Sequence, residues 1–113
     1  MKSPVKRIDW KNDTAIVHAQ GEIDLHISSQ FQLDLKKLIE QKPIKIILDL
    51  NDVPYMDSSG VAALVKLLSK TRSENIKLTL VNLSEKVKSI FEITKLTSVF
   101  DIQNNYDVNA IEN

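Results

Sequence analysis

The sequence predicts an α/β fold, with one small mixed sheet of four to five strands and helices packed against it. The first observation is that strand-like segments alternate with segments whose apolar residues recur three and four positions apart. The second is the length of 113 residues, which fits one compact core. The third is that the chain has only two Gly and three Pro, so it has little sequence that is typical of flexible linkers. We therefore treat residues 1–113 as a single domain.

The chain opens with two strand-like segments. Residues 14–20 alternate small or polar residues with apolar ones and end at Gly21, and residues 5–10 form a shorter extended candidate. Lys11, Asn12 and Asp13 between them favour a turn. These segments predict an antiparallel hairpin.

The first helix and the central strand come next. Helical spacing of apolar residues predicts a helix over residues 28–41, which Pro43 ends. Residues 44–50 are mostly aliphatic and β-branched, as expected for a central strand that is covered on both faces. The buried stripe of the helix is expected to be Ile27, Phe31, Leu35, Leu38 and Ile39.

A polar loop then leads into a second helix. Asp57, Ser58, Ser59 and Gly60 offer side-chain oxygens that could cap the helix, with Ser59 as the expected cap. The helix is expected to end at Glu74 and Asn75, where Asn75 can adopt a left-handed conformation. Its buried stripe is expected to be Val61, Leu64, Val65 and Leu68.

The last third of the chain repeats the strand and helix pattern. Residues 76–81 alternate as a strand, and Ser84 can cap a third helix. Residues 99–102 predict a short extended piece, and residues 106–112 a terminal helical turn. The third helix is expected to bury Val87, Ile90, Phe91 and Thr94.

Charge and composition exclude several classes of function. Fifteen basic residues balance fifteen acidic ones, and the halves before and after residue 56 are balanced too, so a groove for nucleic acid is not expected. The chain has no cysteine for a disulfide, a thiolate or a Cys-based zinc site. Its longest apolar run is five residues, so we expect no membrane insertion and a cytoplasmic location.

Side chains for catalysis are also scarce. The only histidines, His18 and His26, do not have the spacing of a helical metal site, and we expect each to be structural or at the surface. No glycine-rich phosphate loop and no serine-hydrolase elbow is present. We expect a protein that is not an enzyme and needs no cofactor. A hydrolase acting through Ser58 would require a base that the sequence does not supply.

The segment of residues 57–60 remains as the candidate site. One cap oxygen is enough for a helix, so a loop with several candidates leaves at least one hydroxyl free. Such a loop follows the carboxyl end of a predicted strand, where open α/β sheets carry their functional loops. Ala62 and Lys66 continue from Ser58 along the outer face of the helix and offer a surface that a partner could approach.

The chain from residue 44 to residue 64 closely resembles the signature of STAS domains, in particular the bacterial anti-sigma factor antagonists. Residues 21–24, Gly-Glu-Ile-Asp, resemble the Gly-Glu-hydrophobic-Asp motif of that family, and residues 80–96 resemble its third-helix segment. The sequence departs from the family at Lys95, where many members have glycine, and at Glu85, where proline is common. The resemblance covers nearly the whole chain and implies a single STAS-like domain.

The resemblance also implies a regulatory mechanism. A dephosphorylated antagonist of this family binds a serine-kinase anti-sigma factor and so releases the sigma factor. The kinase phosphorylates the antagonist on the serine after the motif aspartate, here Ser58, and a serine phosphatase resets it. Asp24 matches an acidic position implicated in partner binding, and the expected contact surface is Asp24, Asp57, Ser58, Ser59, Gly60, Ala62 and Lys66. The alternative is a STAS adaptor or scaffold subunit that is never phosphorylated.

Overall fold

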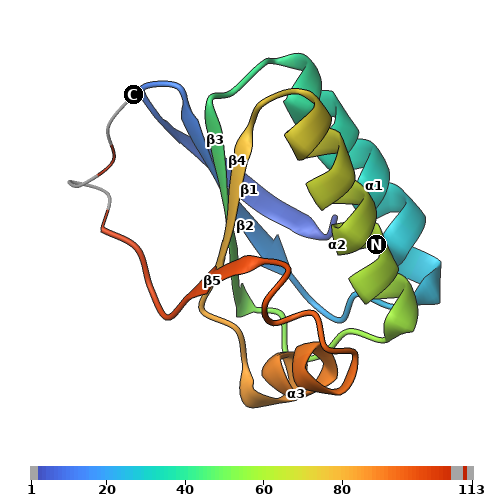
Figure 1. Cartoon of the computed structure of the whole chain (residues 1–113). Coiled ribbons are helices and arrows are strands. Elements are labelled where there is room, and N and C mark those ends of the chain that lie inside the picture. Colours follow the sequence, from blue (N-terminus) through green and yellow to red (C-terminus); the bar gives the residue numbers. More distant parts are fainter. Residues whose placement is uncertain (1–2, 108–110, 112–113) are drawn as a thin grey trace.

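The computed structural model describes residues 3–107 and Ile111. It contains one five-stranded sheet in the order β1-β2-β3-β4-β5, and three helices (Figure 1). The first two strands are antiparallel, and all other neighbours are parallel. The elements are β1 (Val5–Lys11), β2 (Thr14–Gln20), α1 (Leu25–Glu40), β3 (Lys45–Asp52), α2 (Ser58–Ser73), β4 (Lys77–Val81), α3 (Glu85–Ile93) and β5 (Asp101–Gln103). The predicted α/β fold with a mixed sheet is confirmed, and β3 is its central strand.

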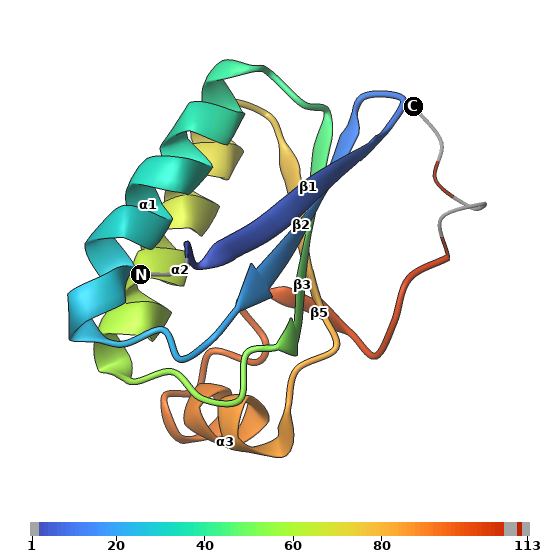
Figure 2. The same ribbon diagram turned by 180° about the vertical axis from the view of Figure 1, so that it is seen from behind.

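The helices cover one face of the sheet and its carboxyl edge. α1 and α2 run side by side over one face, and α3 lies below the carboxyl ends of the strands (Figures 1 and 2). Alternate residues of each strand point to opposite faces, so Leu48 joins the core under the helices while Ile47 points to the other face. Ile16, Ile47 and Val81 form a small cluster there, which Tyr106 and Ile111 partly cover. β3 is thus covered on both faces as predicted, by α1 and α2 on one face and by Tyr106 and Ile111 on the other.

The boundaries of the first helix differ from the prediction. α1 begins at Leu25 rather than at residue 28, because the side chain of Asp24 caps it. The predicted stripe is buried from Phe31 to Ile39, but Ile27 is only half-buried. The helical spacing of apolar residues predicted the middle of the helix correctly. It did not predict the first turn, where the N-cap determines the start of the helix.

The other helices also differ in detail. Val65 was predicted to be buried in α2 but is 41% exposed, while Ala63 and Leu67 complete the buried stripe. In α3 Val87 and Phe91 are buried, and Thr94 is an exposed C-cap. Tyr106 and Asp107 are not helical, so the predicted terminal turn does not begin there. Residues 108–110 and 112 of that turn lie outside the described residues.

Candidate functional site

The candidate site lies where two loops meet at the carboxyl edge of the sheet. The amide of Gly21 donates to the carbonyl of Asp52 at 3.0 Å, and the amide of Ile23 donates to the carbonyl of Tyr55 at 3.1 Å. The amide of Asp57 in turn donates to the carbonyl of Ile23 at 3.3 Å. These bonds join residues 21–23 to residues 52–57, and they hold the start of α1 beside the start of α2.

Asp57 is the residue that caps α2. Its Oδ1 accepts the backbone amides of Ser59 at 2.9 Å and Gly60 at 3.3 Å, and it also accepts the Ser59 hydroxyl. The Ser59 hydroxyl is the largest cause that lowers the pKa of Asp57, with the amides of Gly60, Ser59 and Leu25 adding to it. Asp57 therefore carries a negative charge at neutral pH. Ser59, the expected cap, instead donates its hydroxyl to Asp57.

Ser58 and Ser59 consequently have different surroundings. Ser58 is the exposed first residue of α2, and its hydroxyl has no hydrogen-bond partner within residues 3–107 and Ile111. Ser59 is half-buried, and its hydroxyl is bonded to Asp57. Of these two neighbouring hydroxyls, the one on Ser58 is available for chemistry.

Gly60 allows the two loops to approach each other. A Cβ atom at this position would lie 2.5 Å from the carbonyl oxygen of Ile23 and 2.9 Å from the Cβ of Met56. Both distances are shorter than van der Waals contact, so only glycine fits without movement of the backbone. Gly60 is buried. We expected it at the contact surface, and its place at the close approach of the two loops gives it a packing role.

Asp24 repeats at α1 what Asp57 does at α2. Its Oδ1 accepts the amides of His26 at 3.0 Å and Ile27 at 3.2 Å. The residue is half-buried rather than a free loop carboxylate. Both bonds use Oδ1, so Oδ2 remains available to a partner. Two parallel helices thus begin side by side, and an aspartate caps each of them.

The structure places Ala62 near this site but not Lys66. Ala62 is exposed and lies one helical turn beyond Ser58. Lys66 is exposed one turn beyond Ala62, about 12 Å along the axis from Ser58 by the helical rise. Lys66 borders a groove between α1 and α2 and has no direct part in the loop around Ser58.

Two apolar residues beside the site were not predicted from the sequence. Leu25 is 70% exposed at the start of α1, and Tyr55 is 41% exposed in the loop before Asp57. Because the two loops are joined, these side chains flank the segment that carries Ser58. Leu25 falls outside the apolar stripe of its helix, and that mismatch was the available signal.

The chemistry available at this site is limited. Within the described ranges, no group of three His, Cys, Asp or Glu side chains could hold a metal ion. No helix in the described part of the chain is long and apolar enough to cross a membrane. The site offers one free hydroxyl, two capping carboxylates and a small apolar rim.

Comparison with known proteins identifies the family. The profile of the STAS domain matches residues 6–108, which is most of the chain. The chain belongs to the STAS-domain family. The two joined loops described above lie within the matched range.

Curated relatives of the chain include proteins named anti-sigma-B factor antagonists. It is 31% identical over 88 residues to an anti-sigma-B factor antagonist of Listeria monocytogenes, with 78% of this chain and 77% of the relative covered. It is 35% identical over 86 residues to the anti-sigma-B factor antagonist of Bacillus subtilis, with 76% and 78% covered.

Solved structures share the fold. An anti-sigma factor antagonist from Mycobacterium paratuberculosis superposes with a TM-score of 0.81 at 19% identity, covering 89% of this chain and 86% of that one. The anti-sigma factor antagonist SpoIIAA in its unphosphorylated form gives 0.69 at 20% identity, covering 92% of each chain. Its phosphorylated form gives 0.71 at 21% identity, covering 92% of this chain and 94% of that one.

Proposed function

We propose that this STAS domain is an anti-sigma factor antagonist that works by partner switching. Its dephosphorylated form binds a serine-kinase anti-sigma factor and releases the sigma factor. Phosphorylation of Ser58 ends the binding, and a serine phosphatase restores it. The domain itself catalyses no reaction in this scheme. Its relatives named anti-sigma-B factor antagonists support the regulatory role.

The observation that carries the proposal is the difference between the two serines. Ser58 exposes a free hydroxyl at the first position of α2, whereas the hydroxyl of Ser59 is bonded to Asp57. A kinase can reach Ser58 without breaking a cap. SpoIIAA, a structural neighbour, has been solved in an unphosphorylated and a phosphorylated form, which supports phosphorylation as the switch.

The effect of the phosphate is electrostatic and local. A phosphoryl group adds a charge of about −1.5 to −2 next to the ionised Asp57. The N-terminus of a helix stabilises a nearby negative charge by only about 0.3–1 kcal/mol. The cost of charge repulsion and of desolvation at a packed contact is larger than this stabilisation. The fold does not have to change for the partner to be released.

The contact surface follows from the exposed residues around Ser58. Leu25, Tyr55 and Ala62 offer apolar or small contacts, and the free oxygen of Asp24 offers a charge. Exposed apolar residues next to a polar acceptor are typical of binding sites in which a few anchors supply most of the affinity.

Phosphate mapping tests the proposal. The protein is incubated with ATP and its kinase, for which the first candidate is an ATPase of the histidine-kinase fold encoded in a neighbouring reading frame. Intact-mass and fragment spectra should show one phosphate on Ser58, and the Ser59→Ala variant should still be modified. Modification of Ser59, or none with a kinase that binds, would contradict the proposal. A complex that forms and stays intact regardless of ATP would favour the unphosphorylated adaptor.

A further inference from the structure

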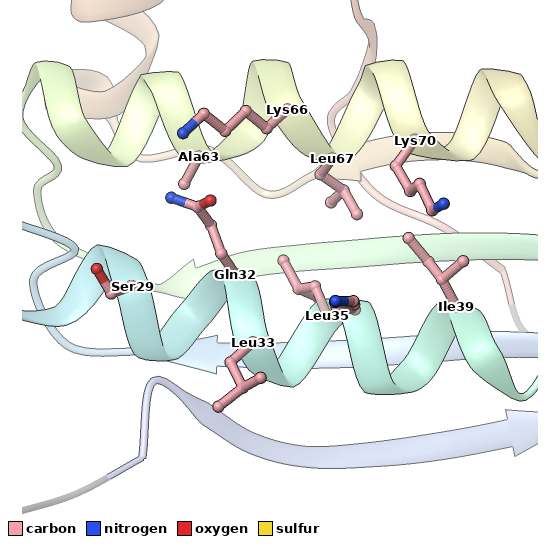
Figure 3. Close-up of a pocket in the computed structure, with 10 residues that line it drawn as sticks. Ser29, Gln32, Leu33, Leu35, Ile39, Ala63, Lys66, Leu67 and Lys70 are labelled. Atoms are coloured by element: carbon pink, nitrogen blue, oxygen red, sulfur yellow. The ribbon is translucent and has the colours of Figure 1, made fainter.

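A groove of about 500 Å³ runs between α1 and α2, apart from the loop that carries Ser58 (Figure 3). Its floor is apolar and consists of Leu35, Ile39, Ala63 and Leu67, which are each at most 5% exposed. The side chain of Gln32 points across the groove toward Ala63 (Figure 3). The small Ala63 side chain leaves the space that a larger residue would fill.

The rim of the groove is positively charged. Lys36 borders it from α1, and Lys66 and Lys70 border it from α2, one turn apart. Among the described residues, no acidic one lines the groove, although the whole chain has a net charge of zero. The ammonium of Lys70 lies 3.6 Å from a carboxylate oxygen of Glu74. Across the described ranges, no carboxylate pairs with Lys36 or Lys66.

The shape of the groove indicates the kind of ligand. It is lined from Ser29 to Ile39, which is about 15 Å along α1 by the helical rise, or three turns. It is open to solvent along this length, so it would leave much of a small ligand exposed. The lysines are spread along both rims and do not converge on one point where a single acid group could bind.

We propose that this groove docks an acidic amphipathic helix of a partner protein. The apolar stripe of such a helix would lie on Leu35, Ile39 and Leu67, in the way that helices dock into hydrophobic grooves. Acidic residues on both sides of the stripe would face Lys36 on one rim and Lys66 and Lys70 on the other. The proposal concerns a surface separate from Ser58 and does not depend on phosphorylation.

Lysine stems can also cover apolar surface without any partner. Covering of apolar surface depends on the aliphatic stem of the lysine, whereas docking of an acidic helix depends on its charge. Replacement of Lys36 or Lys70 by glutamine keeps the Cβ and Cγ methylenes of the stem and removes the charge, and the salt dependence of binding then distinguishes the two roles. Replacement of Gln32 by glutamate places a carboxylate between the rims with almost no change in size.

A designed peptide provides the probe. It is a capped helical peptide with leucines at alternating three- and four-residue spacing and glutamates on both sides of them. One control peptide has lysines instead of the glutamates, and another has the same composition with the leucines scattered around the helix. Each is titrated into the full chain while backbone amide shifts are followed by NMR. Decanoate is titrated separately as a small anionic amphiphile.

The acidic peptide should shift amides of residues 29–39 and 63–70, and binding should weaken in high salt. Each of Lys36→Gln and Lys70→Gln should weaken it about threefold, Gln32→Glu similarly, and charge reversal at both lysines about tenfold. Lys86→Glu on α3, outside the groove, should leave the affinity unchanged. The absence of shifts in the groove would overturn the proposal. Equal binding of either control peptide, or binding of decanoate alone, would also overturn it.

Discussion

Asp24 and Asp57 each cap a helix and also lie at the proposed contact surface. Each accepts two backbone amides through one carboxylate oxygen at the start of its helix. A substitution at either position can therefore change stability and binding together. An effect on binding has to be separated from an effect on the cap.

The first prediction concerns Asp24. Asp24→Ala should lower the free energy of unfolding by about 1 kcal/mol, because α1 loses its N-cap. It should also weaken binding of the kinase. Thermal or urea unfolding and calorimetric binding measure the two effects.

Asp24→Asn is the matched control, since asparagine caps helices as well as aspartate but carries no charge. This variant should keep nearly the stability of the original chain and still bind the kinase more weakly. If it binds as tightly as the original chain, the Asp24 charge has no part in recognition.

The second prediction concerns the pH dependence of stability. The pKa of Asp57 is lowered from its usual value of 3.8, chiefly by the Ser59 hydroxyl, so the folded state favours the charged form. The resulting stabilisation is fully present above pH 3.8 and is lost as the pH falls through the lower native pKa. Urea unfolding from pH 6 down to about pH 2 should show that loss, and Asp57→Asn should remove it from the profile. Superimposable profiles would show that Asp57 is not stabilised as an anion.

The third prediction concerns Gly60. Alanine is the better helix former, yet Gly60→Ala should destabilise the protein by about 1–3 kcal/mol, because its Cβ would press on the carbonyl of Ile23. Ser69→Ala, at an exposed position of the same helix, should be neutral or slightly stabilising. Chemical denaturation of both variants makes the comparison. Equal stability of the two variants would mean that the loops do not need to approach this closely.

At the scale of the elements, each of the three helices is followed by a left-handed residue that is not glycine. Lys42, Asn75 and Lys95 follow the C-caps with φ between 55° and 59°, which is the left-handed region. After α3, the amide of Leu96 donates to the carbonyl of Phe91 at 2.8 Å, and the amide of Lys95 donates to that of Glu92 at 3.1 Å. This is the Schellman arrangement, in which glycine is the preferred left-handed residue. It explains why glycine suits the position of Lys95, where this sequence departs from the family.

The fourth prediction follows from these helix ends. Lys95→Gly should raise the free energy of unfolding by about 0.5–1 kcal/mol, because glycine adopts the left-handed conformation without a Cβ clash. Lys37→Gly, inside the last turn of α1, should instead lower it by about 0.5–1 kcal/mol. Thermal unfolding of both variants tests the difference. A loss of stability from Lys95→Gly would show that the Lys95 side chain makes a favourable contact that outweighs its backbone strain.

Local patterns predicted the elements well where one face of each element is buried. The left-handed Asn75 and the cap at Ser84 were predicted correctly, because both depend on residues nearby in the chain. The start of α1 was predicted wrongly, since Leu25 and His26 do not continue the apolar stripe. Val65 was placed in the core because it is apolar, but it lies on the outer side of α2.

At the scale of the whole molecule, the site depends on contacts that local patterns cannot supply. The sequence predicted a functional loop at residues 57–60, but not the bonds that join residues 21–23 to residues 52–57. It also gave no indication of the exposed Leu25 beside Ser58, or of the groove between α1 and α2. These features arise when parallel crossovers bring two helix starts to one edge of the sheet.

The face of the sheet opposite α1 and α2 also carries contacts that sequence spacing does not predict. His18 was expected to be structural or at the surface, and its ring nitrogens lie 3.0 Å from Asp9 and 3.4 Å from Asp49. Asp49 also accepts from the side chain of Asn82 at 3.2 Å. These residues come from three strands and a loop, so their proximity follows from the order of the strands and not from sequence spacing.

The most direct test of partner switching compares three forms of the chain for binding to one kinase in the presence of nucleotide. Ser58→Ala removes the acceptor and keeps the small contour, whereas Ser58→Asp adds a charge at the start of α2. Because Asp57 is the cap, both variants should fold like the original chain, which circular dichroism verifies. We predict tight binding of Ser58→Ala and of the original chain before it is phosphorylated, with only the alanine complex indifferent to ATP turnover, and at least about tenfold weaker binding of Ser58→Asp. Equal affinities for all three forms would contradict partner switching through Ser58.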